Sequence, residues 1–190
     1  MDNIVVETSA RHCHLTREAI DTLFGKGYKL TPKKDLSQPG QYICEERVEI
    51  VGPKRSLAGV GIIGPERSDI QVELSLTDAR TIGVSAPVRL SGDIKGSAGC
   101  KIVGPAGELE IQEGVLAAQR HIHFDTASAE KFGVKDGEIV SAKIATNGRS
   151  LTFDDVVCRV GEKHHLAMHI DTDESNAAGC GKDTTLELVR

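Results

Sequence analysis

Aromatic residues are scarce in this 190-residue chain, where they make up 3% of the sequence and include no tryptophan. Proteins that bind single-stranded nucleic acid stack bases on aromatic side chains, and nucleic-acid-binding proteins in general carry a basic surface. The net charge of −5 leaves no excess of basic residues from which to build such a surface. The composition therefore argues against a nucleic-acid-binding protein.

Long hydrophobic runs are also missing. No apolar stretch approaches the roughly 20 residues that cross a bilayer. The N-terminus has no basic stretch followed by an apolar run, so it does not resemble a secretory signal peptide. Hydrophobic residues make up 39% of the chain and charged residues 27%, which is typical of soluble globular proteins. We therefore expect a soluble chain that folds as one domain or two small ones.

The cysteines form neither a disulfide framework nor a structural zinc site. They are five in number, widely spaced, and include no C-x-x-C motif. We expect most of them to be small buried residues in a reducing compartment. Cys13 lies between His12 and His14, but the alternation of side chains along a strand points it away from them, so we do not expect a nucleophile there. The five are Cys13, Cys44, Cys100, Cys158 and Cys180.

The tetrapeptide Arg-His-x-His occurs twice, at residues 11–14 and 120–123, and holds four of the seven histidines. In a strand, residues i and i+2 share one face, so each copy presents two imidazoles side by side. Neutral imidazole is the commonest metal ligand and suits zinc, copper, iron and nickel. The repeat predicts a metal site built where the two copies meet.

Three other positions have both a structural and a functional interpretation. His169 lies on an apolar strand just before an acidic helix start, either as a core histidine or as a further metal ligand. Glu73 lies within a predicted strand, either facing solvent or serving as an anionic ligand. Arg67 follows a Gly-Pro turn, either as a surface charge or as a phosphate-binding group. His164 and His165 are adjacent in a polar turn, and we expect them to be surface residues.

The local pattern is mainly that of short strands. Several alternating or apolar segments are separated by Gly and Pro turns, which indicates a barrel or a sandwich. Short helices are predicted after each Arg-His-x-His, ending at Phe24 and Phe132. Two more are predicted after Thr77 and after Asp171. Residues 26–40 are polar and contain two prolines, so we expect a loop there.

Five blocks of sequence span nearly the whole chain: Ser9–Thr16, Gly64–Arg67 with Gln71–Arg80, Ala86–Gly92, Ala118–His123 and Met168–Ala177. In their residues and in their order, these blocks resemble the PduL family of phosphate acyltransferases, the phosphotransacylases of the propanediol-utilisation type.

The resemblance implies a mainly β fold of two small β-barrel domains capped by short α-helices. One barrel would combine residues 1–15 with residues 118–190, so it would be discontinuous in sequence. The other would comprise residues 16–117, with the active site between them. This arrangement would bring the two Arg-His-x-His copies together.

The resemblance also implies a two-zinc site, with Arg67 binding phosphate and Ser91 lining the same site as a catalytic residue. The implied reaction is reversible transfer of a short acyl group between coenzyme A and inorganic phosphate. The sequence shows no activated Ser-His or Cys-His pair, which favours direct attack without an acyl-enzyme. The zinc ligands would be His12, His14, Glu73, His121, His123 and His169.

Family members inside bacterial microcompartments carry an extra amphipathic N-terminal segment. Here the first family strand begins within three or four residues of Met1, so we expect a free cytoplasmic enzyme. The resemblance further implies a homodimer that binds acyl-coenzyme A and phosphate. Two alternatives stay open: a binuclear metal-dependent hydrolase of the thioesterase type, and a metal-binding module without catalysis.

Overall fold

The computed structural model describes residues 4–189, which divide into two compact units. One unit takes in the chain up to Ser9, residues Ser37–Pro39, and the chain from Gln119 onward. The other consists of Ala10–Leu36 and Gly40–Ala118. Each unit is a small β-barrel accompanied by two short helices, so the expected mainly β, two-barrel fold is confirmed.

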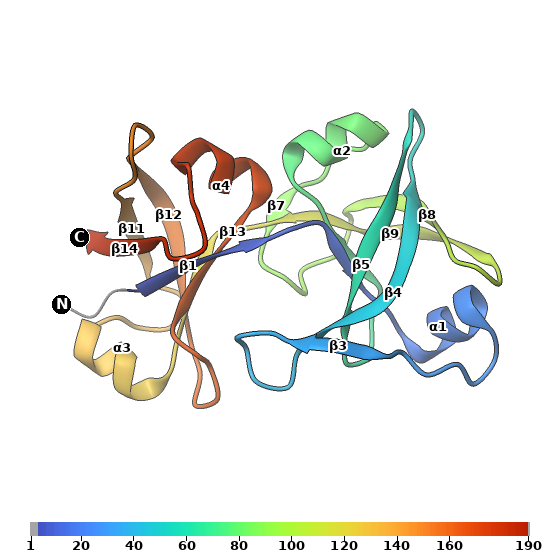
Figure 1. Ribbon diagram of the computed structural model, residues 1–190, viewed down its shortest axis with the longest axis horizontal. Coiled ribbons are helices and arrows are strands. Elements are labelled where there is room, and N and C mark those ends of the chain that lie inside the picture. Colours follow the sequence, from blue (N-terminus) through green and yellow to red (C-terminus); the bar gives the residue numbers. More distant parts are fainter. Residues whose placement is uncertain (1–3, 190) are drawn as a thin grey trace. The chain divides into compact units, whose positions relative to one another are not determined.

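The first unit is a closed six-stranded barrel, in which strands far apart in sequence are neighbours. The order is β1-β13-β10-β12-β11-β14, and Figure 1 shows the blue β1 beside the red strands of the C-terminal segment. β1 runs parallel to β13, with Val6 opposite Met168. The strands are β1 (Ile4–Ser9), β10 (His121–Phe124), β11 (Ile139–Ile144), β12 (Leu151–Val160), β13 (Ala167–Asp171) and β14 (Thr185–Val189).

Two helices of the first unit begin and end where the sequence predicts. In α3 (Thr126–Phe132) and α4 (Thr172–Ala178), an aspartate side chain at the N-cap accepts a backbone N–H of the first turn. Each helix ends at a glycine with φ of 63°, a left-handed conformation that glycine adopts without a Cβ clash. The helices follow β10 and β13 directly, so they fix the ends of the two strands that carry histidines.

The second unit also closes into a ring of six strands, in the order β4-β5-β2-β6-β9-β8, because β8 pairs with both β9 and β4. Two short strands, β3 and β7, pair with β4 and β9 at the margins. The strands are β2 (His12–His14), β3 (Pro32–Asp35), β4 (Tyr42–Val51), β5 (Ser56–Gly64), β6 (Gln71–Glu73), β7 (Val88–Arg89), β8 (Ala98–Val103) and β9 (Glu108–Ala118).

The helices of the second unit are α1 (Arg17–Phe24) and α2 (Leu76–Ile82), capped by Thr16 and Ser75. The loop predicted over residues 26–40 is partly wrong, because it contains β3. All four residues of β3 are exposed, so this marginal strand lacks the alternation that marks a strand with one buried face. Among the helices described, none combines the length and hydrophobicity needed to cross a bilayer.

Candidate functional site

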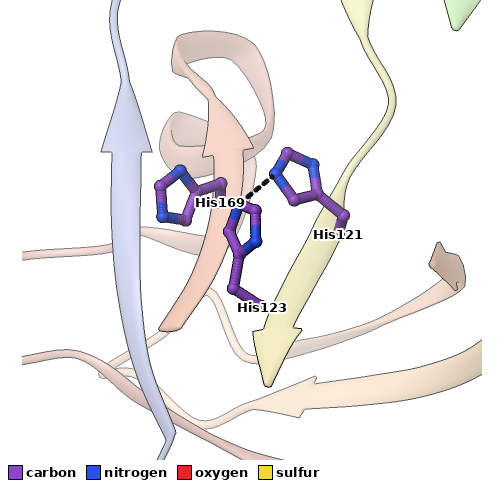
Figure 2. Close-up of side chains that lie close together, drawn as sticks. All are labelled: His121, His123 and His169. Carbon is purple, nitrogen blue, oxygen red and sulfur yellow. Dashed lines mark hydrogen bonds between the residues drawn. The ribbon is translucent and has the colours of Figure 1, made fainter. Parts of the chain in front are cut away.

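Three histidines meet on two neighbouring strands of the first unit. β10 and β13 are antiparallel with His121 directly opposite His169, and His123 lies two residues further along the same face. The ring centroids are 5.3 Å apart for His121 and His169, and 5.0 Å apart for His123 and His169. Figure 2 shows the three imidazoles lying close together. One ligand atom from each lies within 4.8 Å of the others, so the three could hold one metal ion.

The orientation of the two β10 imidazoles fits a metal. Nδ1–H of His121 donates to the carbonyl oxygen of Gln119 at 2.8 Å, which leaves the lone pair on Nε2. That Nε2 faces Nε2 of His123 at 3.2 Å, the contact dashed in Figure 2. Two nitrogens of a tetrahedral zinc ion, each about 2.0–2.1 Å from it, lie about 3.3 Å apart. The pair is therefore spaced as two ligands of one ion would be.

A second group forms in the other unit from β2 and β6. These strands are antiparallel with His12 opposite Glu73. Nε2 of His12 lies 3.5 Å from Oε2 of Glu73, and Nε2 of His14 lies 3.9 Å from Oε1. Nδ1–H of His12 donates to the carbonyl oxygen of Ala10 at 2.8 Å, and Nδ1–H of His14 donates to that of Ile63 at 3.1 Å. Both histidines therefore present Nε2 lone pairs towards the carboxylate.

The carboxylate of Glu73 is held by side chains around it. The Gln71 amide donates to Oε1 at 2.5 Å, and the Ser91 hydroxyl donates to the same oxygen at 2.9 Å. The amide oxygen of Gln71 in turn accepts the N–H of Gly92 at 2.7 Å. Glu73 is 9% exposed, so its interpretation as a solvent-facing strand residue is wrong. Gln71 was not among the predicted site residues, although it lies two positions before Glu73 in the same strand.

Burial keeps two of these imidazoles neutral. Desolvation is the largest cause that lowers the pKa of His14, and the neighbouring His12 and the charge of Arg67 lower it further, to about 3. Desolvation is also the largest cause that lowers the pKa of His123, and the neighbouring His121 and His169 lower it further, to about 2. At neutral pH both rings therefore carry the lone pair that a metal ion needs.

Arg67 belongs to the same unit as the His12–His14–Glu73 group. It follows β5 after the cis peptide bond between Gly64 and Pro65, and its backbone N–H donates to the carbonyl oxygen of Leu15 at 2.9 Å. Its side chain is half-buried, and its charge contributes to the lowered pKa of His14. The guanidinium therefore acts electrostatically on this group.

Cys13, between the two histidines of β2, is fully buried in the core of the second unit. Burial raises the pKa of its thiol well above the ordinary value of 9.0, so the thiol stays protonated. The expectation that Cys13 is not a nucleophile agrees with this environment.

His164 corrects the expectation of two surface histidines. His165 is exposed, as predicted, but His164 is half-buried, and its ring centroid lies 4.5 Å from that of His123. The contact depends on how the chain returns between β12 and β13. No local pattern could have indicated it.

The ligand sets are three imidazoles in one barrel, and two imidazoles with one carboxylate in the other. Both suit zinc and related divalent transition metals. Fold and site together define a protein of two small β-barrels, each with a candidate metal centre on adjacent strands.

Comparison with known sequences places the chain within one family. The sequence profile of phosphate propanoyltransferase matches residues 5–181. A phosphate propanoyltransferase of Clostridioides difficile strain 630 is 52% identical over 187 residues, covering 98% of this chain and 89% of that protein. The enzyme of that name from Thermotoga maritima is 52% identical over 175 residues, covering 92% and 83%. The one from Listeria monocytogenes is 49% identical over 188 residues, covering 98% and 87%. The chain belongs to the phosphate propanoyltransferase family, and it is therefore an enzyme of the phosphate acyltransferase class.

Proposed function

We propose that this enzyme transfers short acyl groups, including propionyl, reversibly between coenzyme A and inorganic phosphate. The observation that carries the proposal is the pair of metal-ligand groups, one accompanied by Arg67, in a chain about half identical to named phosphate propanoyltransferases. The names of those relatives support propionyl as one acyl group.

The proposal assigns one zinc ion to His121, His123 and His169, and a second to His12, His14 and Glu73. The spacing of the two β10 nitrogens and the outward hydrogen bonds of Nδ1 support this assignment. When bound, zinc supplies Lewis acidity that polarises a thioester carbonyl and stabilises the departing thiolate.

In this proposal, Arg67 binds the phosphate nucleophile. A guanidinium presents a planar fork of N–H donors that matches two phosphate oxygens, and it keeps its charge at every physiological pH. A fixed phosphate converts a bimolecular attack into one within a complex. A phosphate oxygen then attacks the thioester carbon, the C–S bond breaks, and coenzyme A leaves as a thiolate that takes a proton from solvent.

In this proposal, Ser91 positions Glu73 and does not attack the substrate. Its hydroxyl donates to Glu73 and accepts from the Gln71 amide at 2.8 Å, so its hydrogen is directed to a metal ligand. Because the buried Cys13 thiol is also protonated, neither residue is activated as a nucleophile. We therefore propose direct transfer without an acyl-enzyme.

The test is phosphate-dependent release of free thiol from acetyl- and propionyl-coenzyme A, before and after metal is removed with a chelator. We expect release that requires both phosphate and metal. Release without phosphate would instead indicate a thioester hydrolase. No release from protein that still holds metal would indicate a binding module.

A cytoplasmic location and a homodimer complete the proposal. The five cysteines are free thiols, which supports a reducing compartment. The mass of the protein in solution tests the homodimer, because a dimer has twice the 20.3 kDa of one chain.

A further inference from the structure

The two Arg-His-x-His segments hold their first histidines alike and their second histidines differently. His12 and His121 each donate Nδ1–H to the carbonyl oxygen two residues earlier, both at 2.8 Å. Nδ1 of His14 also meets a backbone carbonyl, that of Ile63. Nδ1 of His123 instead meets Nδ1 of another imidazole, His164, at 3.4 Å. A carbonyl can only accept a hydrogen bond, whereas an imidazole nitrogen can donate or accept.

His164 is held in place from two sides. Its Nδ1 lies 3.0 Å from the carbonyl oxygen of Arg159, and its ring stands at 78° to that of His123. The ring also covers Gly161, where a Cβ would lie 3.0 Å from Cε1 of His164 and 3.1 Å from Nε2. The chain therefore has a residue without a side chain where the His164 ring needs room.

We propose that His164 is a positioning residue for the metal ligand His123, and that its tautomer changes when the metal binds. This inference rests on the metal site of the proposed function. Nδ1 of His164 has two neighbours, the carbonyl of Arg159 and Nδ1 of His123, and a neutral ring cannot donate to the first and accept from the second at once. Which of the two bonds forms depends on which nitrogen of His123 carries the hydrogen.

With metal on Nε2 of His123, the single hydrogen of that neutral ring sits on Nδ1 and points to His164. Nδ1 of His164 must then accept, so the hydrogen of His164 sits on its Nε2. Without metal, Nδ1–H of His164 donates to the carbonyl of Arg159. Both rings stay neutral throughout, and each keeps one hydrogen. After the exchange, Nδ1–H of His123 has an acceptor in Nδ1 of His164 only when His123 binds metal. This hydrogen bond fixes the His123 ring and makes the ring a better ligand.

The first test measures zinc affinity by competition with a chromophoric chelator. A His14→Ala background disrupts the other ligand group, so the remaining tight site is that of His121, His123 and His169. In this background, His164→Phe keeps a ring over Gly161 but removes both nitrogens. We expect its zinc affinity to fall roughly 10- to 100-fold. The matched control is His165→Phe at the exposed neighbour, which we expect to leave affinity unchanged.

Gly161→Ala gives an independent variant that keeps the His164 imidazole but displaces it. We expect it to weaken zinc binding in the same direction, with the folded state checked by thermal unfolding. A His164→Phe variant that folds and binds zinc as tightly as the background would overturn the inference. A background variant that binds no zinc, although the intact enzyme binds one zinc ion, would contradict the metal assignment of the proposed function instead.

The second test observes the tautomer directly by ¹⁵N NMR of the imidazoles in the full-length enzyme. We expect His164 to carry its hydrogen on Nδ1 in metal-free protein and on Nε2 after zinc is added. A His164 tautomer that is the same in both states would contradict the proposed exchange. A ring that only fills space would show neither the tautomer change nor a loss of affinity in His164→Phe.

Discussion

The Ser91 hydroxyl donates a hydrogen bond to Oε1 of Glu73 at 2.9 Å, and the Gln71 amide donates to the same oxygen at 2.5 Å. The other carboxylate oxygen, Oε2, lies 3.5 Å from Nε2 of His12. The two side-chain donors thus hold Oε1, which also lies 3.9 Å from Nε2 of His14, while Oε2 faces Nε2 of His12. A carboxylate that is held by side-chain donors beside two imidazole nitrogens is typical of one oriented to bind a metal ion.

Ser91→Ala removes one of the two donors to Glu73, so we expect weaker metal binding and a lower kcat, with activity restored by added zinc. Ser91→Thr keeps the hydroxyl and should retain more activity. Metal content by mass spectrometry and kcat across a zinc titration measure the effect. An inactive Ser91→Ala enzyme with its full metal content, together with an acylated Ser91 in the intact enzyme, would contradict the positioning role.

Arg67→Gln removes the proposed phosphate-binding fork. We expect KM for phosphate to rise at least about tenfold, because hydrogen bonds to charged groups contribute about 1.5–3 kcal/mol. KM for acyl-coenzyme A should change much less. Arg55→Gln, at an exposed arginine of the same unit, is the matched control. Equal KM values for phosphate in the two variants would remove Arg67 from the phosphate site.

Cys13→Ala should retain most of the activity, because burial keeps the thiol protonated and the proposed direct transfer does not use it. The substitution should lower the free energy of unfolding by about 1 kcal/mol, because it removes a small buried side chain. Steady-state rates and denaturant unfolding measure the two effects separately. Abolished turnover in a folded, metal-loaded Cys13→Ala enzyme would show that the thiol has a chemical role.

The metal-free protein should lose stability in acid through its buried imidazoles. The pKa of His14 falls from 6.5 to about 3 in the folded state, so between these values the unfolded chain binds a proton that the folded chain does not. Stability therefore decreases as pH falls below about 6.5 and levels off near pH 3. Between pH 7 and pH 5 the expected loss is roughly 1–2 kcal/mol for this histidine.

Urea unfolding of the metal-free protein at pH 7 and pH 5 measures that loss. His14→Asn supplies the comparison, because asparagine does not titrate in this range. Its stability should fall less between the two pH values than that of the unsubstituted protein. An equal decrease in both would mean that His14 does not account for the acid sensitivity.

The sequence predicts those parts of the structure that depend on short spacings. Side chains of the two His-x-His pairs share a face because strand alternation has a period of two, and the helix ends follow from caps such as Asp125 and Gly133. β3 could not be predicted, because its exposed residues have no buried face to give alternation. His164 was missed because its partner, His123, lies 41 residues away. Only the fold sets such a contact.

Gln71 shows a different limit. The period of two places it on the same face as Glu73, but the alternation of Ile70, Val72 and Leu74 does not decide whether this face meets solvent or is enclosed. All three residues of β6 are in fact buried, because β6 lies between β2 and β9 within a closed ring. Closure of the ring, rather than local pattern, decides which polar residues are enclosed.

The central claim is that each barrel holds one metal ion and that both ions are needed for acyl transfer. The most direct measurement counts zinc per chain by native mass spectrometry in the intact enzyme, His12→Ala and His121→Ala, alongside phosphate-dependent thiol release from propionyl-coenzyme A. We predict two ions in the intact enzyme, one in each variant, and loss of thiol release in both. Two ions retained in either variant, or full activity with a single ion, would contradict the account.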